Sequence, residues 1–231
     1  MIYTWHLVVA TGIFGLTTVV ACIKRKHSSL EAKVHRHTVS AQEREHERFK
    51  GNLQSIPQPL LGTQEAPALL HEKCTIPIPN YAISDHSPKD FTRLLRHNMI
   101  SFAHLPQAWI FWLVLPKHRH TFSQAYIKHL DFIKGDLVCG VYRVVKASPT
   151  RVELSMEVPP RFGAVGGLLV IGLQTTEKSG VVLTTETIQW TLKGTINDLP
   201  LSKPLPKFLH EFASASLLVS GAGFLGNLHD L

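Results

Sequence analysis

Apolar residues form one long block at the amino terminus and shorter, patterned blocks in the second two thirds of the chain. The first block, Ile2–Ile23, contains no Asp, Glu, Lys or Arg, and ~20 apolar residues suffice to cross the hydrocarbon core of a bilayer. Basic residues, Lys24–Lys26, follow the block, whereas a secretory signal carries them before it. Residues 1–27 are therefore predicted to form a single-pass membrane anchor, with the following domain in the cytosol, at the endoplasmic reticulum.

The stretch after the anchor, residues 28–69, is polar and predicts a tether. Ser40 and Glu43 have the spacing of a capping box, and they precede a charged run, Gln42–Lys50, that predicts a short solvated helix. Prolines and a glycine then interrupt the pattern. A folded domain is predicted over residues 70–231.

Within this domain the apolar residues have helical spacing first and strand alternation afterwards. The predicted helices cover Ser87–Ile100, Gln107–Leu115, Phe122–Ile133 and Leu205–Leu218. The predicted strands cover Cys74–Pro79, Leu137–Lys146, Arg151–Val158, Gly167–Thr176 and Val181–Leu192. The short separators between the last four strands favour an antiparallel meander.

This order of elements predicts an α+β domain in which an antiparallel sheet grips a helix and encloses a cavity, a helix-grip arrangement. A hot-dog fold, with one central helix wrapped by a sheet, is the alternative. The three helical segments ahead of the meander disfavour it.

The helix predicted over Gln107–Leu115 is unusually apolar, with two tryptophans and a phenylalanine. It is too short to span a membrane. We expect it to lie in the core, to form the wall of a pocket, or to make a second contact with the bilayer.

Composition and charge narrow the classes of function. The chain has 231 residues, of which 24 are Lys or Arg and 17 are Asp or Glu. The positive charge is spread over both halves without a zinc-finger or RNP-type motif, so nucleic acid is not an expected partner. Three cysteines without a CxxC pair provide neither a disulfide framework nor a thiolate zinc site. Because GxSxG is also absent and no GxGxxG follows a predicted strand and opens a helix, no metal and no cofactor are predicted.

Three ionisable residues are candidates for catalysis. Glu186 shares a strand face with Ile188 and Trp190, where burial would disfavour its charged form and suit it to acid–base chemistry; a buried ion pair is the alternative. Arg143 also lies among apolar neighbours, and we expect it to pair with Glu186, either to hold a polar group of a ligand or as a structural salt bridge. His210, near the start of the last helix, could present its imidazole to a substrate or lie on the surface.

In the strand predicted over Arg151–Val158, polar residues alternate with apolar ones. The polar residues expected to face solvent are Arg151, Glu153, Ser155 and Glu157.

The segment Ile76–Leu218 resembles START-like helix-grip domains. The resemblance rests on Leu105–Trp109, on the strand opening Lys134–Asp136, and on Pro206–His210 before the last helix. A membrane-anchored chain of this length is similar to the cyclases of fungal polyketide gene clusters, of the aurovertin-pathway type.

The resemblance implies a non-redox cyclase that helps a polyketide close a ring, for example an α-pyrone formed by attack of an enol oxygen on a thioester carbonyl. Its partners would be a hydrophobic polyketide or acyl substrate, the membrane and a polyketide synthase. Such a step needs a cavity, a base and an oxyanion donor. Glu186 or His210 is the candidate base and Arg143 the candidate donor. The alternatives are a tethered carrier of an apolar metabolite or lipid and, third, a hot-dog acyl thioesterase.

Overall fold

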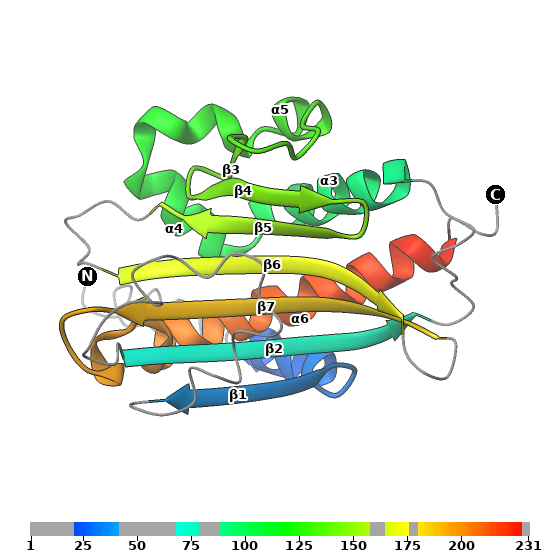
Figure 1. The fold of residues 1–231 in the computed structure, drawn as a ribbon. Coiled ribbons are helices and arrows are strands. Elements are labelled where there is room, and N and C mark those ends of the chain that lie inside the picture. The colour runs from blue at the N-terminus through cyan, green and yellow to red at the C-terminus, as the bar shows by residue number, and fades with distance from the viewer. Residues whose placement is uncertain (1–20, 42–67, 79–87, 158–164, 176–179, 228–231) are drawn as a thin grey trace, which may run out of the picture.

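The computed structural model describes residues 21–41, 68–78, 88–157, 165–175 and 180–227. Its centre is a seven-stranded antiparallel sheet in the order β1-β2-β7-β6-β5-β4-β3 (Figure 1). The strands are β1 (His35–Ala41), β2 (Ala68–Ile78), β3 (Leu137–Val138), β4 (Tyr142–Ser148), β5 (Arg151–Met156), β6 (Val165–Thr175) and β7 (Val181–Thr191). The α-helices are α3 (Pro88–Ala103), α4 (Pro106–Val114), α5 (Gln124–Lys128) and α6 (Pro204–Asn227), and the 3₁₀ helices are η3 (Pro116–Phe122), η5 (Ile196–Asp198) and η6 (Pro200–Ser202).

The long helix α6 lies across one face of the sheet, behind β7 in the view of Figure 1. Leu218 of α6, Leu94 of α3 and Leu183 of β7 have no exposed surface and belong to one hydrophobic core. Gly221 lets α6 approach closely, because a Cβ there would come within 3.0 Å of side chains of both α3 and β7. The α+β class, the antiparallel sheet and the closing helix are therefore as predicted.

Strand β7 is buried on both faces, which explains why its apolar and polar residues do not separate cleanly. The cross-strand register places Glu72 of β2 opposite Thr187, on the face toward α6. Glu186, Ile188 and Trp190 lie on the opposite face, where Ile188 and Trp190 belong to a separate apolar cluster.

Two predicted elements differ from the structure. The helix expected over Phe122–Ile133 is reduced to α5, because Phe122 belongs to η3 and Ser123 is extended, and α5 ends at Lys128. Farther along, Phe132 adopts a φ of 55°, which also excludes a helix that continues to Ile133. The strand expected over Leu137–Lys146 is split into β3 and β4 at Cys139 and Gly140, whose φ values are 47° and 71°. In contrast, α6 continues to Asn227, beyond its predicted end at Leu218.

The edge strand β1 lies inside the stretch predicted to be a polar tether. It pairs antiparallel with β2 along its whole length, from His35 to Ala41, so the folded domain begins before residue 70. The sequence of β1 is polar and lacks the apolar alternation that identifies a strand. The helix predicted over Gln42–Lys50 lies outside the described residues.

The predicted membrane anchor also lies outside the described residues, except for its end. Residues 21–31 form a helix on which Lys24–Lys26 are exposed. Within the described part of the chain, α6 is the one helix with the length and apolar character of a membrane span. It packs against the sheet, as core helices do, and the anchor stays a prediction.

Candidate functional site

A cavity of about 280 Å³ lies between α4, the start of α6 and the neighbouring ends of β6 and β7. Its walls are mostly apolar and include Phe111 of α4 and Leu209 of α6. Toward the centre of the sheet it meets a second, smaller cavity of about 40 Å³. The two share Gln107, Met156, Gln189 and Leu201 in their walls, so they adjoin each other, and we call them the outer and the inner cavity.

A row of three ionisable side chains, Arg36, Glu72 and His210, lies beside the inner cavity. Arg36 of β1 forms an ion pair with Glu72 of β2, and Nε2 of His210 lies 2.9 Å from Oε1 of Glu72. Glu72 and His210 are buried, and His210 lines the inner cavity. The arrangement joins the edge of the sheet to the helix that crosses it.

Arg36 is held from several directions. Its Nη2 donates to Oε1 of Glu31 at 2.6 Å, to Oγ of Ser214 at 3.2 Å and to the carbonyl oxygen of Glu211 at 3.2 Å. Bidentate contact with Glu31 is completed by Nε at 3.0 Å from Oε2. The guanidinium therefore ties the helix of residues 21–31, the sheet and α6 together.

The surroundings of Glu72 and Arg36 favour the charged forms of both side chains. Burial alone would raise the pKa of Glu72, but the hydrogen bond from His210 and the charge of Arg36 outweigh burial and lower the pKa to about 2. Burial likewise opposes the charge of Arg36, yet Glu31 and Glu72 raise the pKa of its guanidinium above the ordinary value. Glu72 is thus an ionised carboxylate at neutral pH.

The ionised state of Glu72 fixes the role of each nitrogen of His210. A carboxylate can only accept hydrogen bonds, so Nε2 of His210 must donate to it. In the neutral imidazole the lone pair is then on Nδ1, which becomes the basic atom. A histidine oriented by a carboxylate in this way is suited to accept and return a proton.

Polar side chains from β7 and α3 complete the inner cavity. Oε1 of Gln189 accepts the backbone N–H of Leu201 at 3.0 Å, which leaves the amide hydrogens of Gln189 as its donors at the junction of the two cavities. Asn98 is 1% exposed and lines the inner cavity, and neither atom of its amide has a hydrogen-bond partner among the described residues. Such an orphaned buried amide is costly unless a ligand satisfies it.

Glu186 is not part of this site. It lies on the face of the sheet opposite α6, where its carboxylate is 3.5 Å from Nε2 of His71 and 3.6 Å from Nζ of Lys73. Burial acts to raise its pKa, as expected from its apolar neighbours, but the hydrogen bond with His71 and the charge of Lys73 lower the pKa overall. Glu186 therefore forms the buried ion pair that was the alternative interpretation.

Arg143 and Glu186 do not pair, so this prediction is wrong. Arg143 forms a bidentate ion pair with Glu157 at the half-exposed edge of the sheet, and its Nη1 donates to the carbonyl oxygen of Gly135 at 2.8 Å. The expectation that Glu153 faces solvent is also wrong, because Glu153 is 1% exposed and pairs with Arg151. Arg143 lies on the same face of the sheet as Glu186, but it belongs to β4, three strands away from β7, so the two side chains do not meet. Glu153 is buried because it lies on the second face of the sheet, where Ile188 and Trp190 are buried too.

The comparisons with known proteins find no match. No protein-family model, no curated protein and no solved structure is similar to the chain. The residues of the site therefore carry the functional argument alone. Among the described residues, no group of three or more His, Cys, Asp or Glu side chains is placed to hold a metal ion.

Sequence patterns missed Arg36, Glu72, Asn98 and Gln189 as site residues. The alternation along β2 contained a usable signal, because Glu72 shares its face with Leu70, Cys74 and Ile76. For Arg36 no comparable signal exists, since β1 is polar throughout.

Proposed function

We propose that this protein binds an elongated apolar polyketide or acyl substrate in the outer cavity and assists its ring closure by acid–base chemistry without a redox cofactor. The observation that supports this proposal is an apolar outer cavity next to an inner cavity that is lined by a buried histidine, which an ionised carboxylate orients. An apolar wall with few polar groups is typical of small-molecule sites. The outer cavity is roughly twice the ~150 Å³ that accommodates a benzene ring in a dry protein cavity.

The residues present suit the closure of an α-pyrone. Nδ1 of His210 takes the enol proton, and the enol oxygen attacks the thioester carbonyl to form the new C–O bond. The amide N–H groups of Gln189 or Asn98 donate to the developing oxyanion. As the C–S bond breaks, the protonated His210 returns its proton to the leaving thiolate, so the products are the lactone and a free thiol.

We further propose that the domain is a helix-grip fold. The helices α3, α4, η3 and α5 precede the meander, and the long helix α6 follows it and crosses the sheet. This order of elements favours the helix-grip fold over the hot-dog fold. The substrate would then be a thioester supplied by a polyketide synthase, at the membrane in which the predicted anchor lies.

A carrier without chemistry is the second candidate. The observation that favours it is the wall of the outer cavity, in which Gln107 and Gln189 are the only polar side chains among the described residues. Covalent acyl transfer through cysteine has less support, because burial raises the pKa of the thiols of Cys74 and Cys139 to about 12 and keeps them protonated.

Product analysis in a host that makes the polyketide tests the proposal. We expect His210→Ala to lower ring-closed product by ~10²–10⁴-fold, as loss of a general base does, while a fluorescent polyene still binds the purified variant. Arg143→Ala is the matched control, because Arg143 lies outside the cavities, and it should leave the product unchanged.

Two outcomes would contradict this proposal. If His210→Ala makes wild-type amounts of product, the protein is a carrier or acts elsewhere. If Leu209→Trp, which fills the outer cavity, changes neither polyene binding nor product, the cavity is not the site.

A further inference from the structure

An exposed apolar surface lies around the mouth of the outer cavity. Five large apolar residues there are between 41% and 64% exposed. They are Trp109, Ile110, Trp112 and Leu113 of α4 and Leu205 of α6. Ile110 and Leu205 also line the cavity, so the apolar surface and the mouth are continuous. Clustered exposure of this kind marks a contact surface rather than scattered surface residues.

Helical geometry explains why these side chains of α4 are exposed. Ala108 is fully buried and Phe111 packs against the core, so this side of α4 faces the sheet. Trp112 and Leu113 follow Trp109 by three and four residues, so they share the opposite side with it. Because α4 has nine residues, it can lie along a bilayer surface but cannot cross it.

The chain segment that carries this surface has basic residues and no acidic ones, and Glu157, which pairs with Arg143, is an acidic residue near His118 of η3. Between Asp90 and Asp131 the chain contains no acidic residue, whereas it contains several basic ones. The basic residues are Arg93, Arg96, Lys117, Arg119 and Lys128. Lys117 and Arg119, directly after α4, are exposed. Exposed tryptophans next to lysine and arginine match the chemistry of a membrane interface with anionic lipids.

Arg119 is fixed against the apolar surface rather than free in solvent. Its guanidinium lies 4.1 Å from the ring centroid of Trp112, and its Nε donates to the carbonyl oxygen of Trp112 at 3.1 Å. Trp109, Trp112, Leu113 and Arg119 line an open groove of about 480 Å³ between α4 and η3. The groove thus offers an apolar wall and one cation, which suits an acyl chain and its anionic headgroup.

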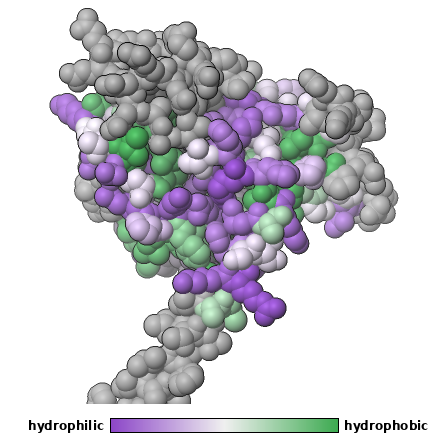
Figure 2. Space-filling view, turned by 90° about the horizontal axis from the view of Figure 1, so that it is seen from below, coloured by the Kyte–Doolittle hydropathy of each residue, from purple (hydrophilic) through white to green (hydrophobic). Residues whose placement is uncertain are grey.

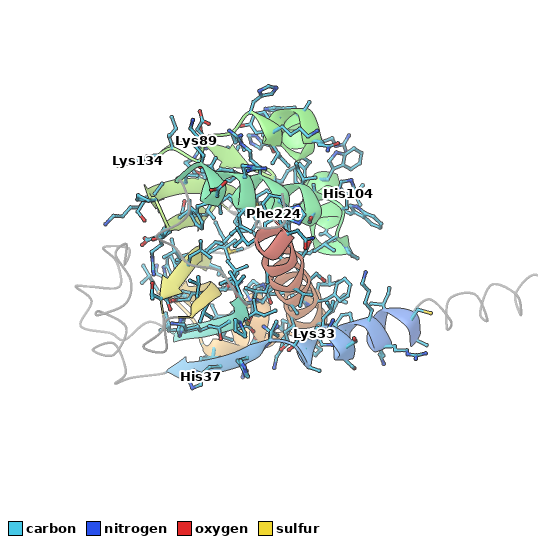
Figure 3. The ribbon with its side chains drawn as sticks, turned by 90° about the vertical axis from the view of Figure 1, so that its right-hand side faces the viewer. Lys33, His37, Lys89, His104, Lys134 and Phe224 are labelled. Carbon is cyan, nitrogen blue, oxygen red and sulfur yellow. The ribbon has the colours of Figure 1, made fainter. Side chains whose placement is uncertain are left out.

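The helix of residues 21–31, the first segment that the structure describes, lies on the same side of the sheet as α4. Figure 3 shows the helix of residues 21–31 projecting from the body on the side of α6, away from the sheet, and His104, which precedes α4, also lies on that side. In Figure 2, hydrophobic residues reach the surface close to this helix. The helix of residues 21–31, which follows the predicted anchor in the sequence, and α4 therefore lie on the same side of the sheet.

We propose that α4 and η3 dock onto the surface of an anionic bilayer, with Trp109, Trp112 and Leu113 in the interface and Lys117 and Arg119 at the headgroups. The mouth of the outer cavity then opens into the interfacial region, and an apolar ligand enters from the bilayer. The route of entry rests on the proposed function, whereas docking itself does not.

Site-specific fluorescence on the full-length chain tests this proposal. An NBD label is attached at Leu113→Cys, at Leu205→Cys on the mouth, or at Ala147→Cys on the exposed β4–β5 hairpin as control, each in a Cys22→Ser background, because Cys74 and Cys139 are buried. The chain is reconstituted in vesicles of phosphatidylcholine and phosphatidylserine. Quenching by spin-labelled lipid reports contact with the bilayer, and quenching by iodide reports contact with water.

We expect spin-labelled lipid to quench the labels at positions 113 and 205 several-fold more strongly than the label at 147, and iodide to show the reverse order. Vesicles of phosphatidylcholine alone, or the double variant Lys117→Gln and Arg119→Gln, should weaken lipid quenching at position 113.

Equal iodide quenching at positions 113 and 147 would overturn docking. Protection of position 113 from iodide without lipid quenching would also overturn it, because a protein would then cover the surface. Lipid quenching at 113 but not at 205 would overturn the placement of the mouth. Polyene binding, blocked by Leu209→Trp, is measured separately, so failure of docking is distinguishable from failure of the cavity as a ligand site.

Discussion

Replacement of Glu72 by glutamine removes the negative charge between Arg36 and His210 and keeps the size of the side chain. The pKa of Glu72 is about 2 in the folded protein against an ordinary value of 4.5. At ~1.36 kcal/mol per pKa unit, this difference corresponds to about 3 kcal/mol of stability at neutral pH. Breaking a buried ion pair by removal of one partner costs a similar ~3–5 kcal/mol, because the other charge stays buried.

The pH dependence has a definite sign. Because the folded pKa is lower than the unfolded one, the stabilisation from Glu72 is complete well above pH 4.5 and is lost as the pH falls toward 2. We expect Glu72→Gln to lower the free energy of unfolding by about 3 kcal/mol at pH 7, and the gap from wild type to shrink to about half by pH 3. Urea unfolding of the full-length chain in a nonionic detergent, followed by circular dichroism, measures both values.

The matched control is Glu157→Gln, which breaks another arginine–glutamate pair. Arg143 and Glu157 are 39% and 45% exposed, and exposed pairs contribute only ~0–1 kcal/mol. The reasoning is refuted if Glu72→Gln loses no more stability than Glu157→Gln at pH 7. A gap from wild type that is constant between pH 7 and pH 3 would refute it equally.

Two further predictions concern packing and thiol accessibility. Gly221→Ala places a Cβ 2.9 Å from Oδ1 of Asn98 and should lower the free energy of unfolding by ~1–3 kcal/mol. Gly223→Ala, on the exposed side of α6, meets nothing within 4 Å and should stabilise the helix by up to ~1 kcal/mol. Equal effects of the two variants in thermal unfolding would contradict the close approach of α6. Cys22 is exposed, whereas Cys74 and Cys139 are buried. A maleimide in mild detergent should therefore label one thiol per native chain and three thiols per unfolded chain. Fast labelling of two or three thiols in the native protein would show that the core is open.

The elements of the domain could mostly be predicted because their patterns are local. Periodic spacing identified α3, α4, β5, β6 and β7 within a few residues. The failures occurred where a left-handed residue broke a pattern, at Phe132 and Cys139, and where an edge strand had no apolar pattern, as in β1.

The candidate site was predicted less well, for a physical reason. Alternation along β7 correctly separated Glu186 from Gln189, but a strand pattern cannot tell which face lies toward the helix when both faces are buried. The face with the larger side chains was chosen, and it is the face away from α6. The pairing of Glu186 with Arg143 was wrong for another reason: both lie on this face, but β6 and β5 separate their strands, and strand order is not visible in a local pattern.

The sequence by itself determined most of the helices and strands, the apolar character of α4 and the place of His210 at the start of the last helix, because these depend on neighbours a few residues away. Only the tertiary structure decided which side chains meet. Pairing of β2 with both β1 and β7 brings Arg36 and Glu72 together beneath α6, where Glu72 contacts a histidine 138 residues later in the chain. The ionised state of Glu72, and with it the basic nitrogen of His210, follows from that encounter, since a pKa depends on surroundings in space and not on position along the chain.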